Sequence, residues 1–296
     1  MKYKLTDKTT EVNGMTLYRI QATKDFGIIR KGDVGGFVQS KSNLSENGTA
    51  WVSGDAKVYH NAKVSMNAQV YGRAEVYGNA KVFGDSRVFR DACIYVNARV
   101  FGNAEVWGNA QVLDNAKVCD AAVVHGDARV SMSAQVYGSV RVFYNADIFG
   151  DAKVFGDARV HGDALVGGDA KVFGSARVLG RAEIYGNAKV SGNARVHGSA
   201  EVRGNAEVYG ESVLSHSVII RGGYTTDSPV FIQGTKHCMN MVYPGILRIG
   251  CEERTVEYWL ENYESIGRSQ GYTDDEIKQY HTYIKMFAQI KSGIPV

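Results

Sequence analysis

A six-residue repeat runs through most of this chain of 296 residues. Every sixth residue from Val52 to Val208 is Val or Ile, and the residue two places earlier is nearly always Ala, with Ser86 and Val140 among the exceptions. The unit is A-x-V-x-G-(D/N). Alternation in A-x-V-x predicts a short strand whose Ala and Val side chains point inward. The G-(D/N) pair predicts a corner, because these residues tolerate a positive φ. The chain is therefore predicted to be a solenoid in which each hexad forms one side.

These residues resemble the hexapeptide-repeat left-handed β-helix superfamily over about residues 50 to 221. The resemblance implies an all-β solenoid, a left-handed parallel β-helix of about nine triangular coils with 18 residues each. The segment "KGDVGGFVQSKSNLSENGTAWVSGDAKV" (31–58) more narrowly resembles a group of largely uncharacterised repeat proteins that phages and prophages often encode. The hallmark of that group is a GG-(F/W)-V segment leading into the helix.

Both ends of such a stack need caps, because an open sheet edge promotes aggregation. Residues 1–49 are expected to form an N-terminal β cap with a hairpin at Asn13-Gly14. Residues 50–221 form the β-helix, and 222–296 a small C-terminal α+β module. In this module we expect a hairpin between "VFIQG" and "GILRIG", then helices at about 255–268 and 274–291. Thr273 and Glu276 are expected to form a capping box.

A period of 18 residues divides the outward slots among three faces. Face C carries a basic row and a parallel aromatic row: Lys63, Lys81, Arg99, Lys117, Lys153, Lys171 and Lys189, with Phe83, Phe101, Tyr137, Phe155 and Phe173. Face A carries Arg141, Arg159, Arg177 and Arg195 beside Phe143, His161 and His197. Face B carries Glu75, Asp147, Glu183 and Glu201 beside Tyr59, Tyr77, Tyr95, Phe149 and Tyr185.

Two interpretations of these rows remain open. Outward aromatic and basic residues stabilise a sheet by stacking and strand propensity alone. However, like charges one layer apart repel by about 0.9 kcal/mol per neighbouring pair even in water, and a long apolar strip usually marks an interface. We therefore expect a partner to bind Lys81, Phe83, Arg99, Phe101, Lys117, Tyr137, Lys153, Phe155, Lys171, Phe173, Lys189, Arg141, Arg159, Arg177 and Arg195. An acidic protein surface is favoured over nucleic acid, because the net charge is only +3.

The resemblance also implies a homo-oligomer, since members of the superfamily commonly form parallel trimers. The expected contact is on face B: Tyr59, Tyr77, Tyr95, Phe149 and Tyr185. In a closed ring, Glu75 or Glu183 of one chain would lie near lysines of the next.

The best-known members of the superfamily are acyl-CoA-dependent acyltransferases, which use a His as general base and usually a loop excursion from one coil. Here the unbroken register leaves no such loop. His125, His161 and His197 share face A, but neighbouring members of this set lie two coils, about 9.6 Å, apart. We expect them to act as stacking residues. In the tail, His237, Cys238 and Cys251 provide three metal ligands where a structural zinc site needs four, so buried thiols are expected instead.

The first residues contain no apolar signal segment, and no run of apolar residues is long enough to span a membrane. We expect a cytoplasmic protein, in the host cytoplasm if a phage encodes it, with its four cysteines reduced and no cofactor or metal. The leading hypothesis is a non-enzymatic interaction or scaffold protein, in one version a mobile-element protein that inhibits or sequesters a host factor. A trimeric acyltransferase and a nucleic-acid-binding rod are the alternatives.

Overall fold

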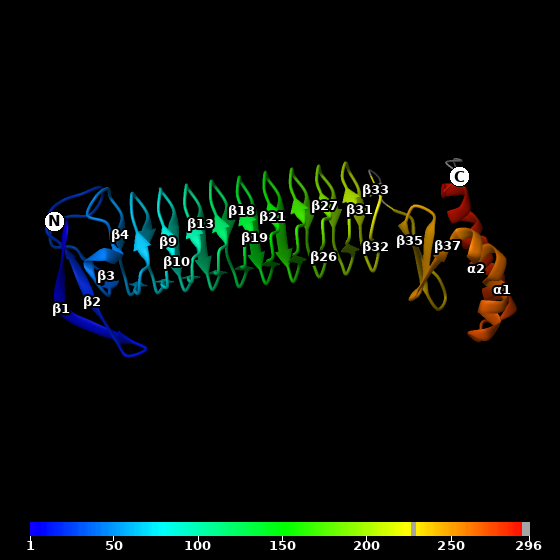
Figure 1. The fold of residues 1–296 in the computed structure, drawn as a ribbon, viewed down its shortest axis with the longest axis horizontal. Helices are drawn as coiled ribbons and strands as arrows, with labels where there is room; N and C mark the ends of the chain where they lie inside the picture. The colour runs from blue at the N-terminus through cyan, green and yellow to red at the C-terminus, as the bar shows by residue number, and fades with distance from the viewer. Residues whose placement is uncertain (226–228, 292–296) are drawn as a thin grey trace.

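The chain forms an elongated parallel β-solenoid of about ten turns of roughly 18 residues, followed by a small antiparallel sheet and two helices (Figure 1). This computed structural model describes residues 1–225 and 229–291. Each turn contributes one strand to each of three sheets, and each strand pairs in parallel with the equivalent strand of the next turn. The predicted β-solenoid with a β cap before it and an α+β module after it is confirmed.

The three sheets correspond to the three faces expected from the sequence. Face A consists of β4 (Trp51–Val52), β7 (Gln69–Val70), β10 (Arg87–Arg90), β13 (Glu105–Gly108), β16 (Val123–Val124), β19 (Arg141–Tyr144), β22 (Arg159–Gly162), β25 (Arg177–Val178), β28 (Arg195–Val196) and β31 (Val213–Leu214). Face C consists of β6 (Lys63–Val64), β9 (Lys81–Val82), β12 (Arg99–Val100), β15 (Lys117–Val118), β18 (Gln135–Val136), β21 (Lys153–Val154), β24 (Lys171–Val172), β27 (Lys189–Val190), β30 (Glu207–Val208) and β33 (Tyr224–Thr225). Face B begins with the N-terminal strands β1 (Tyr3–Val12), β2 (Met15–Ala22) and β3 (Val34–Val38), and continues with β5 (Lys57–Val58), β8 (Glu75–Val76), β11 (Cys93–Ile94), β14 (Gln111–Val112), β17 (Arg129–Val130), β20 (Asp147–Ile148), β23 (Leu165–Val166), β26 (Glu183–Ile184), β29 (Glu201–Val202) and β32 (Ile219–Ile220).

The interior of the solenoid is filled by the Ala and Val slots of the repeat, which are fully buried from turn to turn. Burial of each Val side chain contributes about 1.5–3 kcal/mol relative to leaving it in water. Ser86 replaces Ala in one slot, and its hydroxyl donates a hydrogen bond to the Phe83 carbonyl at 2.9 Å. The polar substitution is therefore satisfied within the wall.

The two residues of each corner have different roles. The glycine slot has a left-handed backbone: Gly84 has a φ of +78°, and a Cβ there would lie 2.8 Å from the Gly102 nitrogen of the next turn. The Asn/Asp slot was also expected to supply positive φ, but the positive-φ residues of the corners lie in the glycine slot. The next slot instead builds side-chain ladders, in which each amide nitrogen donates to the amide oxygen of the following turn at 3.1–3.2 Å: Asn61, Asn79, Asn97 and Asn115.

The N-terminal cap continues the sheet of face B. Strands β1 and β2 form the hairpin predicted at Asn13-Gly14, β2 pairs with β3, and β3 pairs in parallel with β5 of the first turn. A short 3₁₀ helix, η1 (Lys41–Asn43), follows. The buried Lys2 amine donates to the Ala50 carbonyl at 2.8 Å, so it satisfies an acceptor at the open end of the stack.

The C-terminal module has its own sheet and its own core. Strands β34 (Phe231–Gln233), β35 (Cys238–Tyr243), β36 (Ile246–Ile249) and β37 (Glu252–Thr255) precede α1 (Val256–Ser269) and α2 (Asp274–Lys291). The expected pairing of the first and third of these strands is wrong, because β35 lies between them and pairs with both. Both helices and the Thr273–Glu276 capping box are confirmed, with backbone-to-side-chain bonds of 2.8 and 3.2 Å. Neither described helix is long and apolar enough to cross a membrane.

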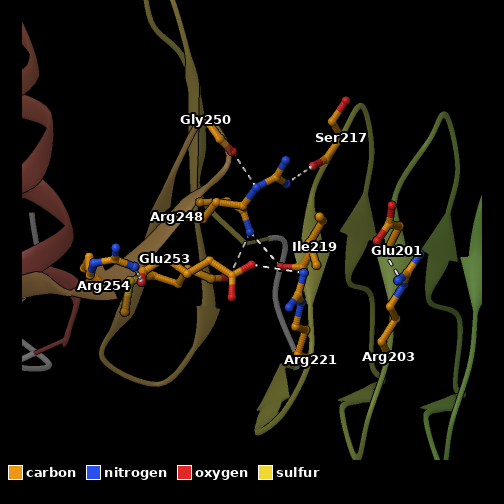
Figure 2. Close-up of polar contacts among 11 residues, drawn as sticks. Glu201, Arg203, Ser217, Ile219, Arg221, Arg248, Gly250, Glu253 and Arg254 are labelled. Atoms are coloured by element: carbon orange, nitrogen blue, oxygen red, sulfur yellow. Dashed lines mark hydrogen bonds and ion pairs between the residues drawn. The ribbon is translucent and has the colours of Figure 1, made fainter. Parts of the chain in front are cut away.

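Polar contacts join this module to the last turn of the solenoid (Figure 2). The Arg221 amide donates to the Val242 carbonyl at 2.9 Å. The buried Asn240 amide donates to the Ile219 carbonyl at 2.8 Å. Two arginine side chains complete the junction, Arg221 with Glu253 at 3.1 Å and Arg248 with the Ser217 carbonyl at 3.2 Å. The module thus covers carbonyl groups of the final turn without joining the three solenoid sheets.

Candidate functional site: the outer faces of the solenoid

The basic residues of faces C and A lie in straight rows, because each strand pairs in register with the next turn. On face C, Lys153 is the pairing partner of Lys171, which in turn pairs with Lys189. The exposed members of the two rows are Lys63, Lys81, Arg99, Lys117 and Lys171 on face C and Arg141, Arg159, Arg177 and Arg195 on face A. Gln135 interrupts the row on face C.

Few of these cations have an acidic partner within the chain. Lys189 binds Glu207 at 2.6 Å, and Arg87 near the start of face A binds Glu105. The other basic residues of the two rows form no ion pair within residues 1–225 and 229–291. On other rows, layer-to-layer pairs neutralise the charge, as between Lys57 and Glu75 at 2.9 Å. Repulsion of about 0.9 kcal/mol per neighbouring pair therefore persists along the unpaired stretches. An external anionic surface would relieve it.

The rows of the two faces meet at a corner. In the stretch "KVFGDARVH" (153–161), Lys153 and Phe155 lie on face C and Arg159 on face A, separated by the corner at 156–157. The next turn repeats the arrangement. We call the following six residues the basic edge: Lys153, Phe155, Arg159, Lys171, Phe173 and Arg177. Neighbouring faces of a three-sided solenoid point in different directions, so a partner that contacts both sides of this edge must be concave.

The aromatic row on face C consists of rings stacked face to face. Centroids lie 5.1 Å apart for Tyr137 and Phe155 and 4.9 Å apart for Phe155 and Phe173, with planes within 2° of parallel. Neighbouring rings cover each other's faces, and the edges, which carry the positive side of the ring quadrupole, point outward. The outward edges of the ladder thus attract negatively charged groups, as the lysines do. Nucleic-acid bases stack on ring faces, and inside this ladder the faces are already occupied.

Face A contains a longer ladder than the sequence had indicated. Six rings stack without interruption at 4.2–5.8 Å: Tyr71, Phe89, Trp107, His125, Phe143 and His161. The first three were not singled out from the sequence, although the same period of 18 places them in this row. The histidine rings are thus members of a stack.

The pKa values of the two stacked histidines fit this role. Partial burial lowers the pKa of His125, and Arg141 and Arg90 lower it further. Burial followed by Arg159 and Arg177 lowers the pKa of His161. Both rings are therefore neutral at pH 7 and stack without adding charge. The expectation that His125 and His161 occupy a stacking row is confirmed.

Face B differs from the expectation of a surface open to another chain. Tyr59 is only 3% exposed and packs against Leu17 and Phe37 of the N-terminal cap, so it is not available as an oligomer contact. Glu75 binds Lys57 and also accepts a hydrogen bond from Tyr59 at 3.0 Å. Both carboxylates near the other end, Glu183 and Glu201, bind Arg203 at 2.9 and 3.0 Å. The expected meeting of Glu75 or Glu183 with lysines of a neighbouring chain would therefore have to break internal ion pairs.

The remaining residues expected at this contact keep an outward position. Tyr77 and Tyr95 stack at 5.0 Å, and Phe149 meets Tyr185 edge to face at 5.9 Å. These two rings meet across Gly167, where a Cβ would lie 2.6 Å from Phe149. Face B thus presents two separate aromatic groups.

The cysteines of the tail lie in different environments. Cys238 is half-buried on β35, whereas Cys251 is exposed in the turn between β36 and β37. The expectation of buried thiols is therefore wrong for Cys251, because this turn projects its side chain to the surface. Among the described residues, no group of three or more His, Cys, Asp or Glu side chains is placed to hold a metal ion.

The fold and its outer rows define a β-solenoid protein with a repeating, charged surface. A family model for the YdcK β-solenoid repeat matches residues 182–198, a short stretch of about one turn that crosses faces B, C and A near the C-terminal end of the solenoid. A comparison with curated proteins finds no match to this chain. The solenoid class is thus supported by both the fold and this repeat, while the match is too short to assign the chain to a family.

Proposed function

We propose that this chain is a non-enzymatic interaction protein whose solenoid holds the basic edge against an acidic protein surface. One observation carries the proposal: cations repeat in register along faces C and A, and in the described part of the chain those of the two rows form no ion pair apart from Lys189 and Arg87. The outward ring edges beside them favour the same negative surface.

The rigidity of the rod strengthens this proposal. Layer-to-layer backbone hydrogen bonds fix the row spacing, so little backbone freedom remains to be lost on binding. Such a surface suits recognition of a partner whose carboxylates lie at matching intervals. A nucleic-acid rod is the weaker alternative, because base stacking on the internal ring faces is blocked.

We further propose that the chain belongs to the hexapeptide-repeat superfamily and to its phage- and prophage-type group. The A-x-V-x-G-(D/N) unit and the GG-F-V segment at residues 35–38 support this assignment. In that setting the acidic partner is a host protein that becomes inhibited or sequestered in the cytoplasm. A trimer would use the partly exposed rings of face B that remain, Tyr77, Tyr95, Phe149 and Tyr185.

Charge reversal on each side of the basic edge tests the proposal. Lys153→Glu with Lys171→Glu changes face C, and Arg159→Glu with Arg177→Glu changes face A in the same two layers. We expect each pair to weaken binding to immobilised poly-L-glutamate at least about tenfold at low salt, because attraction becomes repulsion. Lys4→Glu with Lys8→Glu makes the same charge change on the exposed N-terminal hairpin and serves as the control.

The same variants then discriminate among partners. Proteins captured from the source cell by the wild type should be lost from both double variants and retained by the control. A single-stranded oligonucleotide that binds more tightly than poly-L-glutamate would favour the nucleic-acid alternative, with a steep salt dependence. Saturable heat on titration with acetyl-CoA would favour the acyltransferase. If both double variants bind the recovered partner as the wild type does, the basic edge is not the binding surface.

A further inference from the structure

The C-terminal module contains a pocket that is separate from the solenoid faces. It lies between the α1–α2 hairpin and the adjoining sheet and has a volume of about 150 Å³. Its floor is buried and apolar, formed by Ile249, Trp259, Ile277, Tyr280 and Ile284. Tyr263, Ile266 and Tyr272 form the half-buried sides. An apolar cavity of this size is known to hold a single six-membered aromatic ring in other proteins.

The walls of the pocket are held in place by hydrogen bonds. The Tyr280 hydroxyl accepts from the His237 amide at 2.7 Å and donates to the His237 carbonyl at 2.9 Å. Trp259 donates its indole N–H to the Leu247 carbonyl at 2.9 Å. The Lys236 ammonium, next to His237 in the chain, donates to the Gly271 carbonyl at 2.6 Å and so links this segment to the turn between α1 and α2. The polar atoms of Tyr280 and Trp259 are thus committed to the protein, and the pocket is preformed.

Polar side chains at the rim remain available to a ligand. Within the described residues, His237, Cys251 and Gln270 line the pocket and make no side-chain hydrogen bond. The His237 ring packs on the turn at Gly250, where φ is +62° and a Cβ would lie 3.0 Å from the ring. Glycine is required there for the backbone angle and for the close approach of the imidazole.

The charges around the rim balance. Glu252 is paired with Arg254 at 2.7 Å, and Lys236 lies 3.7 Å from Glu276 and 4.5 Å from the centre of the Tyr272 ring. No net charge of either sign faces the opening from these groups. An ionic ligand would therefore lose its hydration without gaining a counter-charge.

We propose that this pocket binds a small, neutral, planar aromatic molecule with one polar substituent, of the phenol class and about six to ten non-hydrogen atoms. The ring enters between Trp259, Tyr263 and Ile277, and the substituent bonds the imidazole of His237 or the amide of Gln270. This proposal is independent of the basic edge, because it concerns other residues and another class of ligand.

Fluorine NMR on the full chain tests it with three matched probes. We expect 4-fluorophenol to show saturable line broadening, fluorobenzene to bind at least about fivefold more weakly for lack of the polar group, and 4-fluorobenzoate not to bind. Bound 4-fluorophenol should also slow maleimide labelling of Cys251 at the rim. Labelling of Cys119, which lies on face C, should not change and serves as the internal control.

Two variants locate the binding. Ile266→Trp fills the pocket and should abolish binding of both neutral probes. His237→Phe keeps the ring and should remove the preference for 4-fluorophenol over fluorobenzene while the pocket still binds. Amide hydrogen exchange within α1 and α2 verifies that the module of each variant remains folded. The proposal is overturned if 4-fluorophenol shows no saturable binding to the wild type, if 4-fluorobenzoate competes equally, or if folded Ile266→Trp binds as well as the wild type.

Discussion

The two ends of the solenoid are closed in different ways. At the N-terminus, β1, β2 and β3 extend the sheet of face B, and Tyr3 and Ile20 belong to the same buried core as the repeat. At the C-terminus, a separate sheet with its own core, which includes Leu247 and Phe287, contacts the last turn through polar groups and through Phe231, which packs against the edge of the solenoid core. A cap that shares the core must unfold with the rod, whereas a cap with its own core is able to separate from it.

Three tryptophans report on this difference. Trp51 is buried in the first turn, Trp107 lies in the ring ladder of face A, and Trp259 is buried in the C-terminal module. Single-tryptophan versions of the chain therefore follow the N-terminal end, the middle of the rod and the module independently. We expect the first two signals to change together during unfolding and the third to change separately.

The largest effect is expected from Tyr3→Ala. Tyr3 is fully buried and its hydroxyl lies 2.9 Å from the Leu44 carbonyl, so truncation leaves a cavity and removes a hydrogen bond at the shared core. The free energy of unfolding should fall by about 3–5 kcal/mol. Urea denaturation is monitored by circular dichroism and by Trp51 fluorescence. Both transitions should shift together to lower urea concentration.

The control for this variant is Tyr18→Ala, on the exposed side of the same hairpin. It should change stability by much less, since little buried area is lost. A shift in the Trp51 transition without a shift in the circular dichroism of the rod would contradict a shared core.

A smaller and more local effect is expected from Asn240→Leu. The variant leaves the Ile219 carbonyl buried without its donor, which costs about 1–3 kcal/mol. If the module separates from the rod, exchange of the Arg221 amide, which donates to the Val242 carbonyl, should accelerate about 5- to 150-fold. The Trp51 transition should stay in place. Asn262→Ala is the control. It removes a hydrogen bond of the side-chain amide within α1 and should leave this exchange rate unchanged.

The pH dependence of the free energy of unfolding should reveal the lowered pKa of Lys2 in the N-terminal cap. Burial lowers the pKa of this amine to about 8, against the opposing effect of Glu46. Between pH 8 and the higher pKa of the unfolded chain, the unfolded state binds more protons, so stability rises with pH by at most about 1.4 kcal/mol per unit. Thermal unfolding from pH 7.5 to 9.5 measures this rise relative to Lys2→Met.

Other groups ionise in this pH range and have the opposite effect on the free energy of unfolding. Burial raises the pKa of Cys119 to about 11, so its contribution to stability declines as the unfolded thiol ionises. The comparison with Lys2→Met cancels that contribution, because Cys119 is present in both proteins. Parallel pH curves for the two proteins would show that Lys2 keeps an ordinary pKa.

The smallest effect is expected from Glu253→Gln at the other end. Its ion pair with Arg221 is partly exposed, and such pairs contribute about 0.2–1 kcal/mol. Exchange of the Arg221 amide should accelerate less than about fivefold at low salt, and the difference should fade in concentrated salt because of screening. Glu264→Gln, which breaks a pair within α1, is the control. An effect equal to that of Asn240→Leu would mean that the ion pair, rather than the buried amide, holds the module.

Much of the solenoid was predictable because each residue contacts residues one turn away. Counting by six assigned Val154 to the interior, and counting by 18 placed Lys153 beside Lys171, as the strand register confirms. Counting by 18 also places the rings of the ladder through Trp107 in one row. In the tail, helix periodicity and the Thr273 cap were sufficient to place both helices, because these signals are local.

The sequence by itself determined the repeat, the inward and outward slots and the order of charges along each face. The tertiary structure decided which outward residues remain accessible: Tyr59 lies under Leu17 and Phe37, and Glu183 is neutralised by Arg203. It also decided that β35 lies between its neighbours, and that a pocket forms beneath His237. The physical reason is that these features depend on single contacts between segments far apart in the chain, which no repeating pattern encodes.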